Sequence, residues 1–225
     1  MYKITMLNTS SHIVTLYHAS REFAFCAIAE ANEKDASAYD ETSGFKNLLL
    51  EAAGLLTCNL SPEDWPLEMA RAVESILINW HEQNFGARAV FYAAATLSLG
   101  KIYVCTAGSC RIHLIKNRKL VAITRDHNVI DDPVEGFAKG NDERLLPIHL
   151  RIPTRSIGHG NNSRPPECQI WRAEGEYTVL ISSSNFHDFR QPATYLDSFM
   201  QGKVELMQDV RHAAGVLINI ESVIG

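Results

Sequence analysis

The sequence of 225 residues predicts an α+β fold, a four-layer α-β-β-α sandwich of two antiparallel sheets flanked by helix pairs. Short apolar or alternating segments, which are typical of strands, dominate both ends of the chain. The helical segments come in consecutive pairs, so strands and helices do not alternate. This order disfavours a parallel, doubly wound sheet. The length suits one domain or at most two.

The first half of the chain begins with strands and continues with two helices. Three short strands are expected at Tyr2–Leu7, His12–Tyr17 and Glu22–Ala29. Helices are expected at Ser43–Thr57 and Pro62–Gln83, because apolar residues recur there at helical spacing. Ser61 is the expected N-cap of the second helix, with Pro62 at its first position.

From Arg88 onward the hydrophobic spacing becomes typical of strands. An antiparallel meander of consecutive strands is expected at Arg88–Ser98, Lys101–Thr106, Cys110–Lys116 and Lys119–Thr124. A short helix is expected near Asp132–Lys139. Further strands are expected at His149–Ile152, Glu167–Arg172, Tyr177–Ser182 and Gly215–Ile224, with helices at Pro192–Phe199 and Val204–Ala214.

Composition excludes several classes of function. The net charge is −5 and no run of five basic residues occurs, which argues against a nucleic-acid partner. No apolar stretch approaches the ~18 residues of a membrane span, and the first residues do not form a secretion signal. The five cysteines are odd in number and scattered without a C-x-x-C pair. We therefore expect a cytoplasmic protein with reduced thiols and no zinc site.

Two motifs lie in the middle of the chain, Gly108-Ser109-Cys110-Arg111 and Thr124-Arg125-Asp126-His127. They resemble the G-D-S-R and T-x-D-H motifs of the metal-dependent protein phosphatases of type 2C, the PPM family. Segments that resemble outer motifs of the family, in the same order, are Asn8–Ser11 (N-E-D-S), Phe25–Ala31 (F-A-x-V-A-D-G), Arg151–Gly158 (n-x-L-T-R-A-L-G), Thr178–Asp188 (L-L-L-C-S-D-G-L-x-D) and Ile218–Ile220 (D-N-I). The resemblance implies a single type 2C phosphatase-like domain over residues 1–225. It also implies structural roles for Gly108, Arg111, Asp126 and His127.

The resemblance also implies a reaction, the hydrolysis of phosphoserine and phosphothreonine by a pair of Mg²⁺ or Mn²⁺ ions. Such ions require oxygen ligands, chiefly carboxylates. Glu30 keeps a carboxylate at the first ligand position, but Ser184 and Ile218 stand where aspartates are expected. The vestigial metal-site positions that follow from the motifs are Ser10, Glu30, Ala31, Ser184, Asn185, Asp188 and Ile218.

These replacements predict that catalysis is lost. Isoleucine cannot bind a metal ion, and Ser10 and Ser184 carry no charge. Two divalent cations placed there would face a large uncompensated desolvation cost. We therefore expect no intact catalytic residue, no bound metal and no cofactor, and thus a pseudophosphatase that acts as a regulatory or interaction scaffold. Its expected partner is a protein, such as a phosphoprotein or a kinase.

Two alternatives remain open from the sequence. The first is a divergent Mg²⁺- or Mn²⁺-dependent Ser/Thr phosphatase, in which Glu30 and Asp188 are the candidates for holding one ion weakly. The second is a subunit whose fold only supports oligomerisation. The sequence does not fix the oligomeric state.

Overall fold

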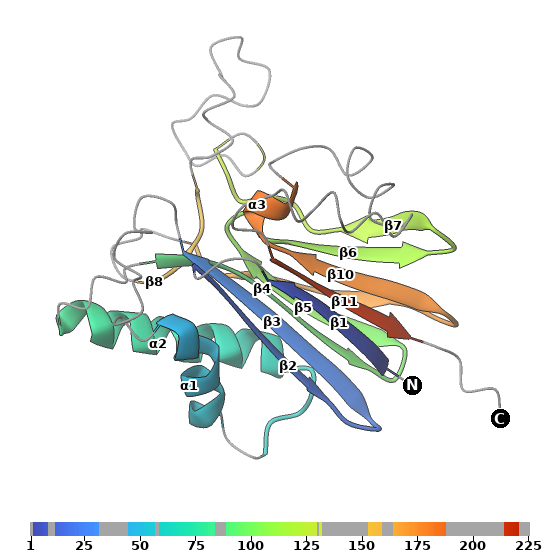
Figure 1. Ribbon diagram of the computed structural model, residues 1–225, viewed down its shortest axis with the longest axis horizontal. Helices are drawn as coiled ribbons and strands as arrows, with labels where there is room; N and C mark the ends of the chain where they lie inside the picture. Colours follow the sequence, from blue (N-terminus) through green and yellow to red (C-terminus); the bar gives the residue numbers. More distant parts are fainter. Residues whose placement is uncertain are drawn as a thin grey trace, which may run out of the picture.

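The computed structural model describes residues 2–8, 12–31, 45–56, 59–83, 89–129, 131, 153–158, 164–187 and 214–220. Two antiparallel sheets lie face to face, and helices cover the outer face of one of them (Figure 1). The α+β sandwich predicted from the order of strands and helices is confirmed.

Each sheet combines strands from distant parts of the chain. The first has the order β1 (Tyr2–Asn8), β11 (Ala214–Ile220), β10 (Tyr177–Ser182), β6 (Arg111–Lys116) and β7 (Lys119–Ile123). The second has the order β2 (Ile13–Ala19), β3 (Phe23–Ala31), β4 (Ala89–Ser98), β5 (Lys101–Ala107) and β9 (Glu167–Arg172). The two-residue strand β8 (Ile157–Gly158) pairs with β4. The described strands up to β10 lie within two residues of their predicted ranges, apart from the unpredicted β8.

The strand β3 is buried on both faces because it lies between two hydrophobic cores. Cys26 and Ile28 belong to the core between the sheets. Ala27 and Ala29 belong to the core between the second sheet and the helices. Successive side chains of a strand point to opposite faces, so Glu30 points in the same direction as Ile28, between the sheets.

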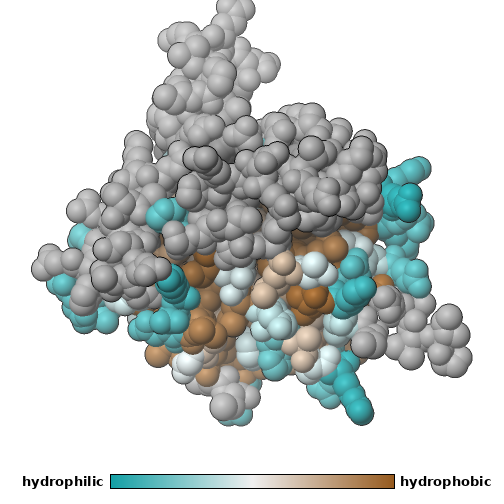
Figure 2. Space-filling model, viewed as in Figure 1, coloured by the Kyte–Doolittle hydropathy of each residue, from teal (hydrophilic) through white to brown (hydrophobic). Residues whose placement is uncertain are grey.

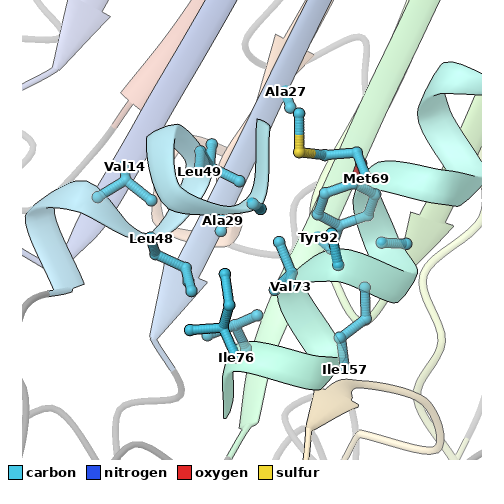
Figure 3. Close-up of a cluster of buried hydrophobic side chains, with 14 of the residues drawn as sticks. Val14, Ala27, Ala29, Leu48, Leu49, Met69, Val73, Ile76, Tyr92 and Ile157 are labelled. Atoms are coloured by element: carbon cyan, nitrogen blue, oxygen red, sulfur yellow. The ribbon is translucent and has the colours of Figure 1, made fainter. Parts of the chain in front are cut away.

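The helices α1 (Leu48–Leu55) and α2 (Trp65–Glu82) pack on the outer face of the second sheet. A short 3₁₀ turn, η2 (Phe45–Asn47), precedes α1. Figure 3 shows Met69, Val73 and Ile76 of α2 converging with Tyr92 of β4. These residues recur at helical spacing, and their burial is the main driving force that holds α2 on the sheet.

Large apolar side chains that remain exposed are spread over several elements. They include Met6, Tyr17, Leu50, Leu55 and Ile170. Figure 2 shows hydrophobic areas interrupted by hydrophilic residues on the face toward the viewer. Exposed apolar residues scattered in this way are normal for a folded surface. Within the described residues, no helix is both long and apolar enough to cross a membrane.

Two local predictions are wrong. The strands β4 to β7 do not form one meander, because β4–β5 is a hairpin of the second sheet and β6–β7 a hairpin of the first. The chain crosses between the sheets at residues 108–110. The helix α2 begins at Trp65 after the N-cap Asp64, while Ser61 Oγ donates a hydrogen bond to the Asp64 carboxylate, 2.9 Å away. Ser61 therefore organises the turn that precedes the helix and does not cap it.

Other predicted elements lie outside the described residues. They are the short helix near Asp132–Lys139, the strand at His149–Ile152, the helix at Pro192–Phe199 and all but the last residue of the helix at Val204–Ala214. Ala214 itself begins β11, so the strand starts one residue earlier than predicted.

Candidate functional site

Glu30 and Ser184 meet in the space between the two sheets. Glu30 is the second-last residue of β3 and is only 3% exposed. Ser184 follows β10 as the first residue of a one-turn helix, α3 (Ser184–His187), and is also buried. The strands that carry them belong to different sheets, so the packing of the sandwich brings together two positions that are 154 residues apart. The sequence motifs predicted that these two positions share one site.

Both oxygen atoms of the Glu30 carboxylate accept hydrogen bonds from Ser184. The Ser184 backbone N–H donates to Oε2 over 2.7 Å, and its hydroxyl donates to Oε1 over 2.8 Å. The Cys110 thiol also lies 3.5 Å from Oε2. Hydrogen bonds to an ionised acceptor are short and strong, and they offset the cost of burying the charge.

Cys110 is held as a protonated thiol beside this carboxylate. Burial raises its pKa well above the ordinary value, and the negative charge of Glu30 raises it further. A protonated thiol is a donor, which suits the Glu30 oxygen that it faces. The motifs placed Cys110 in a turn but gave no signal that its thiol would reach Glu30.

Of the other predicted site positions, Ala31 and Asn185 follow Glu30 and Ser184 directly in the chain. Ala31 follows Glu30, but its side chain belongs to the core on the helix side, and its N–H donates to the His12 carbonyl over 2.9 Å. Asn185 lies in α3 beside Ser184. Ser10 and Asp188 lie outside the described residues.

Ile218 does not lie at this site, so its predicted place there is wrong. It pairs with Val179 on one side and Ile4 on the other, in the core between the sheets. The strand position beside Ser183 is Ala214, whose N–H donates to Ser183 Oγ and whose carbonyl accepts from Ser183 N–H, both over 2.9 Å. The strand register therefore places Ile218 about 13 Å farther along β11. Ala214, like isoleucine, offers no carboxylate.

His187 connects α3 to the turn that joins the two sheets. Its Nε2 lies 2.8 Å from the carbonyl oxygen of Ser109, and its ring is fully buried. Because a carbonyl only accepts, Nε2 carries the proton and donates it. This contact, together with the Cys110 thiol, fixes the turn against the Glu30–Ser184 pair.

Two of the four predicted structural positions form a buried ion pair. Arg111 donates from Nε to Asp126 Oδ1 over 2.7 Å and from Nη2 to Oδ2 over 2.8 Å. Burial raises the pKa of the Asp126 carboxyl, and the two hydrogen bonds from Arg111 oppose that effect. This bidentate geometry fixes the segment after β7 against the start of β6.

Gly108 and His127 bring two loops together at the same end of the sandwich. Gly108 has a φ of +89°, and a Cβ added there would lie 2.3 Å from Cδ1 of Phe91. Its carbonyl accepts a hydrogen bond from His127 N–H over 3.0 Å. His127 Nε2 in turn lies 3.0 Å from Oε2 of Glu167 in β9.

Glu167 is the acidic partner of this loop network. Partial burial acts to raise its pKa, but hydrogen bonds from His127, Gln169 and Arg125 together lower it to about 2. Glu167 is therefore ionised at neutral pH. The hydrogen bonds of Arg111, Asp126, His127 and the Gly108 carbonyl thus join loops and strands at this end of the sandwich.

The donor atoms of this site do not suit a pair of Mg²⁺ or Mn²⁺ ions. Glu30 is the one carboxylate at the site within the described residues, and both of its oxygens already accept hydrogen bonds. The same part of the chain holds no group of three or more His, Cys, Asp or Glu side chains that could hold a metal ion together. Hard divalent ions need several oxygen ligands with compensating charge.

Comparisons with known proteins give a result at the level of the fold. No family model and no curated protein sequence matches the chain. Solved structures do match over nearly the whole length of both chains. The structure of the S. agalactiae serine/threonine phosphatase is similar to this one, with a TM-score of 0.73 and 14% sequence identity. The match covers 99% of this chain and 100% of that chain.

Two further solved structures are similar in the same way. The Mycobacterium tuberculosis serine/threonine phosphatase PstP/Ppp has a TM-score of 0.67 and 14% identity, with 99% of this chain and 98% of that one covered. PppA, a regulatory component of the Pseudomonas aeruginosa T6SS, has a TM-score of 0.69 and 10% identity, with coverages of 97% and 96%. This agreement confirms the fold that the motifs predicted: the chain has the fold of the type 2C serine/threonine protein phosphatases.

Proposed function

We propose that this protein is a type 2C phosphatase-like module that has lost catalysis and acts through binding to another protein. The observation that carries the proposal is the Glu30–Ser184 pair. At the position where the resemblance implies a second metal-binding aspartate, a serine donates two hydrogen bonds to the Glu30 carboxylate.

Charge balance explains why this arrangement opposes a metal pair. Two divalent cations bring four positive charges, whereas Glu30 supplies one negative charge at the site within the described residues. Metal binding would also have to displace the Ser184 donors and the Cys110 thiol from the carboxylate. The desolvation cost of such an uncompensated charge is several kcal/mol per ion, on the order of the whole stability of a domain.

The proposed partner is a phosphoprotein or a kinase, and the proposed compartment is the cytoplasm. The sequence supports that compartment, because its five cysteines are odd in number and scattered without a C-x-x-C pair. Thiols remain reduced in the cytosol. Surface plasmon resonance tests the partner class by comparing how tightly a protein binds to this one in its phosphorylated and unphosphorylated forms. Size-exclusion chromatography tests whether this protein instead associates with itself.

Hydrolysis of phosphoserine and phosphothreonine peptides in the presence of Mn²⁺ tests the loss of catalysis. The expected result is the same background rate for the wild type and for Glu30→Ala. A Mn²⁺-dependent turnover that disappears in Glu30→Ala would overturn the proposal in favour of a divergent phosphatase. Glu30→Gln is the matched control, because it keeps the shape of the side chain but removes the charge and one of the two acceptor oxygens.

A further inference from the structure

A pair of thiols outside the Glu30–Ser184 site lies on the helix side of the second sheet. Cys105 of β5 and Cys168 of β9 are directly opposite each other in the strand register. Their sulfur atoms are 3.1 Å apart. Cys105 is buried in the core beneath the helices, whereas Cys168 is exposed. The pair therefore has one accessible and one protected sulfur.

The backbone geometry of this pair is compatible with a disulfide. Residues directly opposite on antiparallel strands have Cα atoms about 4.5 or 5.5 Å apart, and both values fall within the range that disulfides span. The two sulfur atoms need to approach by roughly 1 Å to reach bonding distance. Rotation of the side chains can supply this movement without a shift of either strand.

Cys168 is also accessible to a small reagent. It lines a cleft of about 420 Å³ between the second sheet and the segment that leads into α2, together with Asp64, Leu67, Tyr103 and Ile170. The hydrogen bond from the Cys105 thiol lowers the pKa of Cys168, burial opposes this, and the positive charge of Arg71 adds to the lowering. The same pairing raises the pKa of Cys105. Cys168 is thus the thiol that ionises first.

We propose that Cys105 and Cys168 form a redox modification site that closes to a cross-strand disulfide by exchange with a low-molecular-weight disulfide. This inference stands apart from the proposed loss of catalysis, because it uses neither Glu30 nor Ser184. Its geometry is that of a resolving pair, in which an exposed thiolate attacks first and a buried neighbour completes the reaction.

The exchange takes place in two steps. The Cys168 thiolate attacks one sulfur of the small disulfide, whose S–S bond breaks, and one small thiolate leaves. Cys105 then attacks the Cys168 sulfur, so that the mixed disulfide breaks, and the second small thiolate leaves with the proton from the Cys105 thiol. Two protein thiols are oxidised, and one small disulfide is reduced to two thiols.

The disulfide would link β5 to β9 covalently, between two cysteines that are 63 residues apart in the sequence. A crosslink over a loop of this length restricts the unfolded state, and the oxidised protein is expected to melt roughly 10 °C higher than the reduced one. This shift gives a second readout that does not depend on chemical labelling.

The test incubates the full-length folded protein with oxidised glutathione and follows it by intact-mass spectrometry, peptide mapping and thermal melting. The expected product has lost two hydrogen atoms, carries a Cys105–Cys168 crosslink and has the higher melting temperature. In Cys105→Ala, the second step is blocked, so one glutathione should stay attached to Cys168. In Cys168→Ser, no modification of Cys105 is expected, because its sulfur is buried.

Two results would overturn the proposal. One is a wild-type protein that keeps glutathione on Cys168 without forming the crosslink. The other is a Cys168 that reacts no faster than the buried Cys26, whose pKa is raised by burial. The melting temperature of each reduced variant, compared with that of the reduced wild type, shows whether the variant is folded and can be interpreted.

Discussion

Glu30 is the buried carboxylate at the centre of the candidate site. A buried carboxylate requires donors, and Ser184 provides two of them through its backbone and its side chain. In the phosphatase family that the motifs resemble, metal ions would supply positive charge next to this carboxylate. In this protein, hydrogen bonds satisfy it. Ser184 thus acts as a hydrogen-bond donor to Glu30 at the position where the resemblance implies an aspartate.

Replacing Ser184 tests this donor role. Ser184→Ala removes the hydroxyl donor to Oε1 and leaves the backbone donor to Oε2 in place. The free energy of unfolding should fall by about 1.5–3 kcal/mol, the range for a hydrogen bond to a charged group. Urea denaturation measures it, and Glu30→Ala, which removes both acceptor oxygens, completes a double-mutant cycle. A coupling energy near zero would show that the pair does not interact.

His113 is a second buried residue with a testable consequence. It is fully buried in β6, and burial lowers its pKa to about 3, with a smaller contribution from the charge of Arg111. Its Nδ1 lies 3.2 Å from the Leu180 carbonyl. The unfolded chain binds a proton at this histidine below about pH 6.5, where the folded protein does not.

Stability should therefore fall as the pH drops from about 6.5 toward 3. The contribution of one such histidine to the slope is at most about 1.4 kcal/mol per pH unit. Urea denaturation at pH 7.5 and pH 5 measures the change. His113→Gln removes the titrating group, so its stability should depend less on pH over the same window. An unchanged pH dependence in that variant would contradict the assignment.

At the scale of elements, the turn between β5 and β6 carries the chain from one sheet to the other. Gly108 makes this crossing possible, because its backbone adopts a left-handed φ of +89° directly against Phe91. The same turn presents the Cys110 thiol to Glu30 and the Ser109 carbonyl to His187. A distortion here would therefore reach the candidate site.

Gly108→Ala and Gly175→Ala form a matched pair of substitutions. Both glycines have a positive φ, but a Cβ at Gly175 meets nothing within 4 Å, whereas at Gly108 it would clash with Phe91. Gly175→Ala should cost about 1–2 kcal/mol of backbone strain. Gly108→Ala should cost at least about 2 kcal/mol more, because the ring and the β4 backbone must also move. Equal losses by thermal or urea unfolding would contradict the steric explanation.

At the scale of the whole molecule, local patterns predicted the elements but not all of their partners. The ranges of β9 and β10 agree with the sequence because each strand is a short apolar or alternating run bounded by polar residues. The meander was wrong because β5 pairs with β9 and β6 with β10, and such distant pairings leave no trace in local spacing. The one-turn helix α3 is too short to show helical periodicity.

The sequence predicted part of the candidate site, but not the contacts that depend on strand register or on packing between the sheets. The order of the motifs predicted one site for Glu30 and Ser184, since each motif fixes the end of one strand, and the two residues are in contact. It failed for Ile218, because a short match near the chain end contains no information about strand register, and the pairing places Ala214 beside Ser183. The thiol contact of Cys110 depends on the packing of both sheets, which no single segment encodes.

A calorimetric titration of the wild-type protein with Mn²⁺ tests most directly whether the metal site is lost. The proposed loss of catalysis predicts no tight binding, with heats equal to those of Glu30→Ala, because the Ser184 donors already occupy the Glu30 carboxylate. Tight binding of a pair of Mn²⁺ ions that disappears in Glu30→Ala would contradict it, since the carboxylate would then be a metal ligand.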